Sequence, residues 1–406
     1  MKRIINHLLL VLMLLFMPTL VFTQESRSVG STEWEDGIIK FRSKDGRFMT
    51  HFDVRMYING AYFIEDAHKL SSGTHLRKAR FAMKTKLWDV WQAEWDVDIA
   101  EGDVEIKDMF FSYNGFDNSH IKVGHFKMPL GLEELTSSRY QTFIERAYPM
   151  LAFETDRRTG LEYSRWGRRW NIRSAVYGQS MDPVKNKVRD ETGNGIAARL
   201  VIAPVLNDYL TTHTAGAVVY QVPDDSSHVI AYASEPETKM GDIEILNTGN
   251  ILNVDNTLRF GLEGAVVYKN ISLQGEYIQT KVRRMNGFKD ATFSGGYAFL
   301  SFVLTGETRP WQATDGEFGQ IVPNDNKLGA WELATRYSYL DLTDEDAAIF
   351  GGMANNYTVG INWYANSNVR IMLNYTMVDN SENATGNNIP ADYDFSVFHV
   401  MAVVYF

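Results

Sequence analysis

The sequence predicts an all-β protein, specifically a transmembrane antiparallel β-barrel of about sixteen strands. Three observations support this: the C-terminal segment, the N-terminal segment and the alternation between them. Residues 396–406 place Phe398, Val400 and Phe406 on one face of a strand, because strand side chains alternate between faces. A strand with an apolar residue at every second position, ending at a Phe, is typical of the last strand of a bacterial outer-membrane barrel.

The N-terminal segment predicts export. Lys2 and Arg3 precede an uncharged apolar run from Leu8 to Phe22, and Thr23 is a small residue suited to cleavage. The run is too short to cross a bilayer of roughly 30 Å comfortably as a helix. We therefore interpret residues 1–23 as a signal peptide that is cleaved near residue 23.

The remaining chain divides into a lead-in and a barrel. Residues 24–47 are polar and charged, and we expect a periplasmic lead-in there. No later stretch approaches 18 apolar residues, so residues 48–406 must cross the outer membrane as a barrel, the other fold that satisfies its backbone in lipid.

Composition agrees with a barrel. The mean hydropathy is −0.25, lower than a helical membrane protein shows, whereas a barrel restricts its apolar residues to alternate positions. A chain without Cys has no disulfide framework. The net charge of −10 argues against nucleic acid as a partner. We expect no metal site and no cofactor.

Alternation begins near residue 50. Phe52, Val54 and Met56 share one phase, and Asp53 and Arg55 share the other. About seventeen segments read this way, and single-chain bacterial barrels have even strand numbers, so sixteen is the expected count. A strand of a soluble sandwich would show the same pattern. A soluble chain of this length would normally split into two or three domains, and no linker divides this one.

Residues 126–160 break the alternation. Pro129 and Gly131 predict a turn, and the segment is too long for a hairpin and too apolar to lie only in solvent. We expect a constriction loop folded into the lumen; an extracellular lid is the alternative. The polar stretches 306–327 and 379–395 are expected to be surface loops.

Charged residues gather on one strand and around this loop. In the segment 75–88, Lys78, Arg80 and Lys84 share a polar face, whereas Arg77 has the opposite phase and is expected at the strand's end. Lys at mid-membrane costs about 2–4 kcal/mol, so this face is lumen or solvent. The next strand carries acidic residues, so the bases either pair with them or remain free. The loop region adds Lys127, Ser137, Ser138, Arg139, Arg157 and Arg158.

Several motifs together resemble the phosphate-selective porin O and P family of Gram-negative outer membranes. The loop reads Phe126-Lys-Met-Pro-Leu-Gly-Leu-Glu-Glu-Leu-Thr-Ser-Ser-Arg139, followed by Thr142-Phe-Ile-Glu-Arg146. Arg77-Lys-Ala-Arg80 matches a family Arg-Arg-Ala pattern with Lys at its second position. Further matches are Phe293-Ser-Gly-Gly-Tyr297, Leu304-Thr-Gly-Glu-Thr-Arg309, Gly329-Ala-Trp-Glu-Leu333, Arg336-Tyr-Ser-Tyr339 and Gly360-Ile-Asn-Trp363.

The resemblance implies a trimeric porin for passive diffusion of small anions, such as phosphate or polyphosphate, through a basic constriction. It implies anion contacts at Arg77 and Lys78, at Ser137 and Ser138, and a lumen carboxylate at Asp108. Because Lys78 lacks the planar fork of Arg, the resemblance implies anion preference more strongly than phosphate specificity. The implied partners are phosphate-like anions, outer-membrane lipid, the barrel insertion machinery and two further copies of the chain.

Two other functions are considered. One is a plugged barrel that serves binding or adhesion. The other is an outer-membrane hydrolase using Ser137 or Ser138 with His51 or His125, but their spacing matches no catalytic motif. We therefore expect a channel and not an enzyme.

Overall fold

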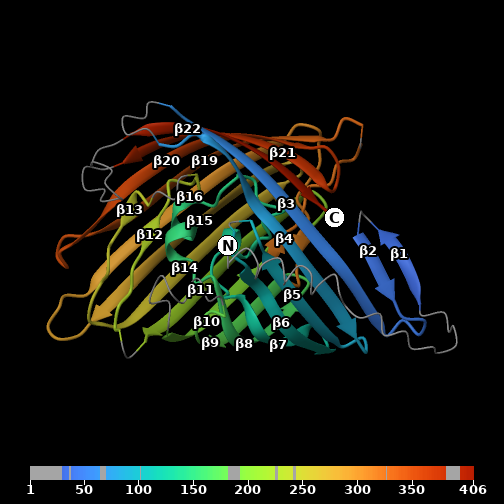
Figure 1. Ribbon diagram of the computed structural model, residues 1–406, viewed down its shortest axis with the longest axis horizontal. Helices are drawn as coiled ribbons and strands as arrows, with labels where there is room; N and C mark the ends of the chain where they lie inside the picture. Colours follow the sequence, from blue (N-terminus) through green and yellow to red (C-terminus); the bar gives the residue numbers. More distant parts are fainter. Residues whose placement is uncertain are drawn as a thin grey trace, which may run out of the picture.

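A closed antiparallel β-barrel forms the body of the molecule (Figure 1). The computed structural model describes residues 30–35, 38–64, 70–100, 102–181, 193–224, 227–240, 244–325, 327–380 and 394–406. Neighbouring wall strands pair in chain order, and the last one, β22 (Phe395–Tyr405), pairs back with β3 (Phe48–Ile64). The predicted fold class is thus confirmed. The predicted signal peptide lies outside the described residues.

Sixteen strands make the wall, as the sequence predicts. Besides β3 and β22 they are β4 (Gly73–Leu87), β5 (Trp91–Asp98), β6 (Glu105–Phe116), β7 (Ser119–Lys127), β8 (Arg157–Gly167), β9 (Trp170–Tyr177), β10 (Gly193–Ile202), β11 (Leu210–Pro223), β14 (Val254–Tyr268), β15 (Ile271–Arg284), β16 (Ala291–Val303), β19 (Ala330–Asp344), β20 (Ile349–Tyr364) and β21 (Val369–Asn380). One of the seventeen alternating segments, residues 227–234, is not a wall strand.

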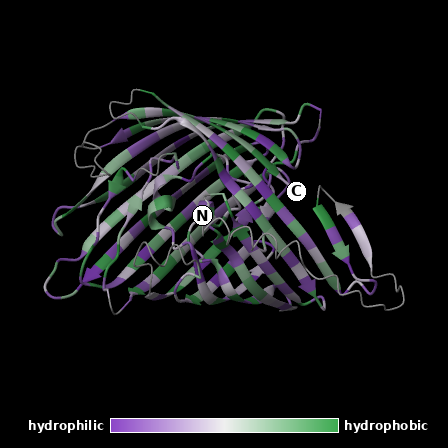
Figure 2. Ribbon diagram, in the orientation of Figure 1, coloured by the Kyte–Doolittle hydropathy of each residue, from purple (hydrophilic) through white to green (hydrophobic). Residues whose placement is uncertain are grey.

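Hydrophilic and hydrophobic residues alternate along the wall strands (Figure 2), and the apolar ones are the exposed set while the polar ones are buried. In β14, Phe260 and Leu262 are 48% and 63% exposed, whereas Arg259 and Glu263 are 3% and 5% exposed. In β22, Phe398 and Val400 point outward in the predicted phase. The outward residues therefore form the surface that meets lipid.

A short hairpin extends the sheet before the barrel. β1 (Ser31–Glu35) pairs with β2 (Ile38–Arg42), and β2 pairs with the first residues of β3 (Figure 1). The backbone of Phe406 bonds to Val54, so β22 leaves the start of β3 unpaired on that side. An unpaired sheet edge accepts a further strand, and β2 occupies it. No strand is expected in the lead-in from sequence, and its periplasmic location stays a prediction.

Three connecting segments turn into the barrel. The first, residues 128–156 between β7 and β8, carries α2 (Leu132–Leu135) and α3 (Tyr148–Phe153). We call it the inner loop. The second, residues 224–253, carries β12 (Ala233–Ser234) and β13 (Leu246–Asn247); the third, residues 304–329, carries β17 (Trp311–Gln312) and β18 (Glu317–Phe318). No helix among the described residues is long and apolar enough to cross a membrane.

The inner loop fills one side of the lumen. α3 contacts β15, β16 and β19, and Phe143, Met150 and Phe153 belong to one buried apolar cluster with Phe293 and Phe299 of the wall. The inward-folded constriction loop predicted from the sequence is thus present. The lid alternative is wrong, because the loop is buried along most of its length.

The third segment corrects one expectation. Residues 306–327 are predicted to be a surface loop, but Arg309, Glu317 and Phe318 are buried. Arg309 forms an ion pair with Glu332 of β19 and donates to the carbonyl of Tyr140 in the inner loop at 3.2 Å. At Arg309 the polar composition of this segment therefore serves a buried ion pair. Of the other expected surface loop, residues 381–393 lie outside the described residues.

Candidate functional site

The inner loop is held to one side of the wall by hydrogen bonds to its backbone. The N–H groups of Leu132 and Glu133 both donate to the carboxylate of Glu276 on β15, each at 2.7 Å. Arg336 on β19 donates to the carbonyl of Glu145 at 3.0 Å and to the Glu133 carboxylate at 3.3 Å. Buried backbone groups need such partners, so these contacts fix the loop's position.

Strands β20 and β21 continue this attachment. Asn362 donates to the carbonyl of Thr142 at 2.7 Å, and Arg370 donates to the carbonyl of Gln141 at 2.7 Å. The loop thus leans on the wall from β15 to β21. The opposite wall, from β4 to β9, is left facing open space.

A cavity of about 900 Å³ occupies that space. It is lined by Arg55 of β3, by β4–β9, by the open side of the inner loop, by part of the segment 304–329 and by Lys239. Thirteen lining side chains are basic and nine are acidic, a formal excess of four positive charges. The whole chain carries −10, so the lumen surface and the molecule have opposite signs.

Four further carboxylates lie just behind the lining: Asp53, Asp96, Glu134 and Glu162. Each forms an ion pair with a lining base, for example Glu162 with Arg173 at 2.7 Å. They offset the excess in total charge. The positive character is therefore confined to the cavity surface.

Ten of the eleven predicted site residues line this one cavity: Arg77, Lys78, Arg80, Lys84, Asp108, Lys127, Ser137, Ser138, Arg139 and Arg157. They come from four wall strands and the inner loop, which are far apart in sequence. Arg158 lies outside the lining, and its Nε donates to the carbonyl of Thr155 at 3.1 Å.

Arg77 reaches the lumen by a β-bulge and not by lying at a strand end as expected. Tyr57 of β3 lies opposite Lys78, and Ile58 lies opposite Leu76, so Arg77 is an extra residue without a partner in the ladder. A bulge re-aims the side chains around it. Arg77 and Lys78 therefore both line the cavity, and Arg77 makes two hydrogen bonds to Glu145 at 2.7 and 3.0 Å.

Most of the predicted bases are paired with carboxylates. Lys84 lies 3.2 Å from Glu94, and Arg80 lies 3.1 Å from Asp98. Asp108, predicted as a lumen carboxylate, binds Arg157 at 2.9 Å. The sequence leaves open whether these bases pair with acidic residues or remain free. On this wall most of them pair, because neighbouring strands neutralise one another's charge.

Two lysines on the cavity differ. Among the described residues, no carboxylate forms an ion pair with Lys78 or Lys239. The Nζ of Lys78 lies 5.1 Å from the centre of the Tyr57 ring. Both lysines and Arg77 act electrostatically on Glu145. We call Arg77, Lys78 and Lys239 the basic cluster; it brings two lysines and one arginine to a single carboxylate.

Among the acids of the inner loop, Glu145 stays charged. Burial alone would raise the pKa of Glu145, but the Arg77 guanidinium outweighs it and lowers the pKa to about 2. Glu145 therefore neutralises Arg77 at neutral pH, and the two lysines of the cluster form no ion pair with a carboxylate among the described residues.

The predicted serines lie beside this cluster. The Ser138 hydroxyl is 3.3 Å from the Tyr57 hydroxyl, whose ring lies under Lys78. The Ser137 hydroxyl accepts from the backbone N–H of Arg139 at 3.5 Å. Arg139 in turn lies 3.3 Å from Asp53. The hydroxyls of Ser138 and Tyr57 thus lie beside Lys78 on one part of the cavity wall.

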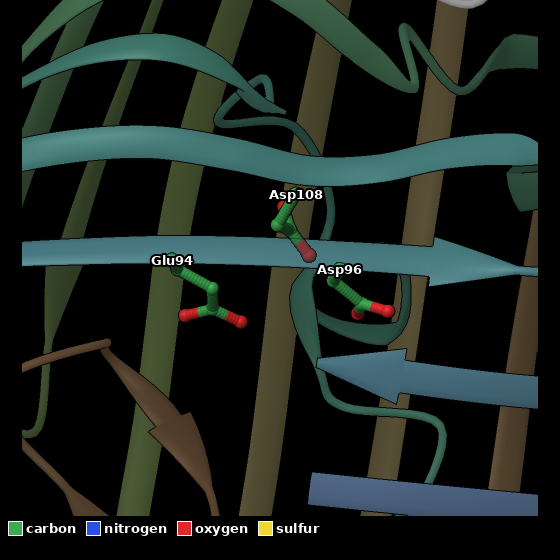
Figure 3. Close-up of side chains that lie close together, drawn as sticks. All are labelled: Glu94, Asp96 and Asp108. Atoms are coloured by element: carbon green, nitrogen blue, oxygen red, sulfur yellow. The ribbon is translucent and has the colours of Figure 1, made fainter. Parts of the chain in front are cut away.

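One group of acidic residues on the same wall could hold a metal ion. Carboxylate oxygens of Glu94, Asp96 and Asp108 lie within 4.8 Å of one another, and the three side chains converge from β5 and β6 (Figure 3). Neither Glu94 nor Asp96 is predicted as a site residue, because from sequence they are only the acidic face opposite a basic strand.

Comparison with known proteins gives one consistent result. A family model described as phosphate-selective porin O and P matches residues 50–406. Porin O of Pseudomonas aeruginosa is 27% identical over 316 residues, which cover 70% of each chain. A protein of Caulobacter vibrioides described as uncharacterized is 27% identical over 290 residues, covering 68% of this chain and 57% of that one.

Solved structures share the fold. A trimer form of Vibrio cholerae OmpT, an outer membrane protein, superposes with a TM-score of 0.57 at 10% identity, covering 88% of this chain and 99% of that one. An anion-selective porin from Comamonas acidovorans gives a TM-score of 0.55 at 13% identity, covering 88% and 100%.

Proposed function

This chain belongs to the phosphate-selective porin O and P family, and we propose that the basic cluster is where its passing anions are held. The protein is a porin of the bacterial outer membrane that passes anions. The proposal concerns which residues favour anions over cations and how strongly they do so. The observation that carries it is that no carboxylate among the described residues forms an ion pair with Lys78 or Lys239.

An anion gains most from a base that has no partner. At a paired base such as Lys84, the anion must first compete with a carboxylate 3.2 Å away. At Lys78 and Lys239 no such competitor is present among the described residues. A channel needs contacts that are favourable enough for entry and weak enough for exit. Two free lysines beside a neutralised arginine meet that need.

The chemistry of the cluster favours small anions in general over tight phosphate binding. Lys78 is a point charge, whereas an arginine there would present a planar fork to two phosphate oxygens. The hydroxyls of Ser138 and Tyr57 can donate single hydrogen bonds to an oxyanion nearby. We expect chloride and phosphate both to pass. Phosphate should be held more briefly than by an arginine that contacts two of its oxygens.

Catalysis has no support at this site. The hydrolase alternative needs a histidine acting on Ser137 or Ser138. The Nδ1 of His125 instead lies 2.6 Å from the carbonyl of Lys107, and its Nε2 lies 3.0 Å from the Ser180 hydroxyl. We therefore propose that the protein is not an enzyme.

We also propose a homotrimer, whose membrane insertion depends on lipid and on the barrel insertion machinery. The trimer form of Vibrio cholerae OmpT supports this assembly for the shared fold. Nucleic acid is not a proposed partner, given the net charge of −10.

Reversal potentials test the proposal directly. Purified protein is inserted into a planar bilayer that separates two potassium chloride concentrations. We expect a potential of the sign that anion preference gives. A cation preference would contradict the anion channel, and the absence of any conductance would favour the plugged barrel.

A further inference from the structure

The acidic group on β5 and β6 is built by the local backbone. Glu94 and Asp96 are two residues apart on β5 and so share its inner face. The register then shifts: Trp95 lies opposite Met109, but Val97 lies opposite Ile106. Asp108 falls within this irregularity, and its carboxylate meets the other two (Figure 3).

Asp96 is the unusual member of the group. Its side chain is 1% exposed, and its Oδ1 has no hydrogen-bond partner. Its other oxygen lies 3.7 Å from Nη1 of Arg80, longer than a hydrogen bond. A buried carboxylate oxygen without a donor is costly. A cation between the three carboxylates would supply the missing partner.

We propose that Glu94, Asp96 and Asp108 form a binding site for a divalent cation, and specifically for calcium. Calcium accepts six to eight oxygen ligands in flexible arrangements, and water can complete a set begun by three carboxylates. Magnesium demands a near-ideal octahedron and gives up its water reluctantly, so this irregular group suits it less.

The proposed ion would compete with three bases for the same oxygens. Lys84 lies 3.2 Å from Glu94, Arg80 lies 3.7 Å from Asp96, and Arg157 lies 2.9 Å from Asp108. All three bases line the cavity. With these carboxylates turned to calcium, each base keeps one carboxylate fewer: Arg80 retains Asp98 at 3.1 Å, Arg157 retains Asp156 at 3.5 Å and Lys84 retains Asp53 at 3.9 Å. Calcium thus increases anion preference, an effect that rests on the proposed anion channel, whereas the binding itself does not.

Binding is measured first, on the full-length protein in uncharged detergent and free of lipopolysaccharide. Titration calorimetry with calcium chloride should give one saturable site per chain, with a dissociation constant in the range of about 10⁻⁴–10⁻³ M that extracellular sites show. Asp96→Asn should weaken it at least about tenfold, the loss of one charged ligand. Glu105→Gln removes a cavity carboxylate on β6 outside the group and should leave the affinity unchanged.

A second variant, Glu94→Gln, keeps the buried aspartate and should also weaken binding, which guards against a folding defect in Asp96→Asn. Both variants are checked for an intact barrel by circular dichroism. Absence of saturable binding in the wild type overturns the site. Equal affinity in the wild type and in both folded variants also overturns it, because calcium then binds elsewhere.

The effect on selectivity is measured separately. Reversal potentials are recorded with millimolar calcium and with potassium chloride of equal ionic strength, which reproduces general screening. Calcium should shift the wild type towards anions and leave Asp96→Asn unshifted. Binding without a shift overturns the coupling alone. Cation preference in both solutions overturns the anion channel, while the calorimetry still decides the calcium site.

Discussion

The two sides of the barrel wall carry similar inward bases but give them different partners. On the side from β14 to β21, three arginines donate to backbone carbonyls of the inner loop: Arg259, Arg336 and Arg370. On the side from β4 to β9, bases such as Arg80 and Lys84 face the cavity and pair with carboxylates of neighbouring strands. The first side positions the loop, and we propose that the second meets the solute. Charge by itself does not distinguish the two roles; the partner does.

The largest expected effect comes from a substitution on the side of the wall that positions the inner loop. Arg336→Met leaves Glu133 and Glu237 buried without their guanidinium, which lies 3.3 and 2.6 Å from them. Removing one partner of a buried pair costs about 3–5 kcal/mol. We expect a lower thermal unfolding temperature and larger, noisier single-channel currents as the inner loop loses its anchor.

Arg139→Met is the matched control. Arg139 belongs to the inner loop and has a partner at 3.3 Å, Asp53, but its side chain is more exposed than that of Arg336. Its loss should lower the unfolding temperature much less. Equal losses in the two variants would mean that Arg336 has no special role in holding the loop.

The wall and the loop were predictable because lipid imposes a simple pattern. Every wall strand must present apolar residues at every second position, so alternation reveals the strands and its failure reveals residues 126–160. The segment 227–234 shows the limit. It alternates as well, yet it lies in a segment that turns into the lumen. Alternation indicates that a strand has an apolar face but not whether lipid or protein covers that face.

Other features could not be predicted from local sequence, because they depend on partners that are distant in the chain. The inward course of the segment around Arg309 follows from the ion pair of Arg309 with Glu332 on another strand. The lumen position of Arg77 follows from a bulge against β3. Lys239 joins the basic cluster through the packing of a loop, and no local pattern marks it. Local sequence therefore finds the bases but not which of them remain unpaired.

The next effect concerns the solute side. Lys78→Gln and Lys239→Gln each remove an unpaired charge from the cavity, and we expect each to reduce the ratio of chloride to potassium permeability by about threefold, because charge in a confined cleft concentrates counter-ions. The double variant should lose more. Lys289→Gln, at a lysine 66% exposed, is the control and should retain the wild-type ratio. Unchanged reversal potentials in the double variant would reject the basic cluster.

A substitution with a smaller expected effect should increase the preference for phosphate over chloride without altering charge. Lys78→Arg restores a planar fork next to Arg77, and we expect phosphate to block chloride current at a concentration about threefold to tenfold lower than in the wild type. Single-channel current in chloride is recorded against increasing phosphate. Lys84→Arg, at a base already paired with Glu94, is the comparison and should change the block less. An equal change at both positions would mean that pairing does not matter.

The smallest effect tests the hydroxyls beside the cluster. Ser138→Ala and Tyr57→Phe each remove one side of the 3.3 Å contact, and Tyr57→Phe keeps the ring under Lys78. A single neutral hydrogen bond contributes about 0.5–1.5 kcal/mol, so each variant should change phosphate block only a few-fold. If the two hydroxyls act together, the double variant should lose no more than either single one, whereas additive losses would show that each contacts the anion independently. Either way the effect should stay below that of removing Lys78, because the cluster's charge, and not its hydroxyls, separates this side of the wall from the side that holds the loop.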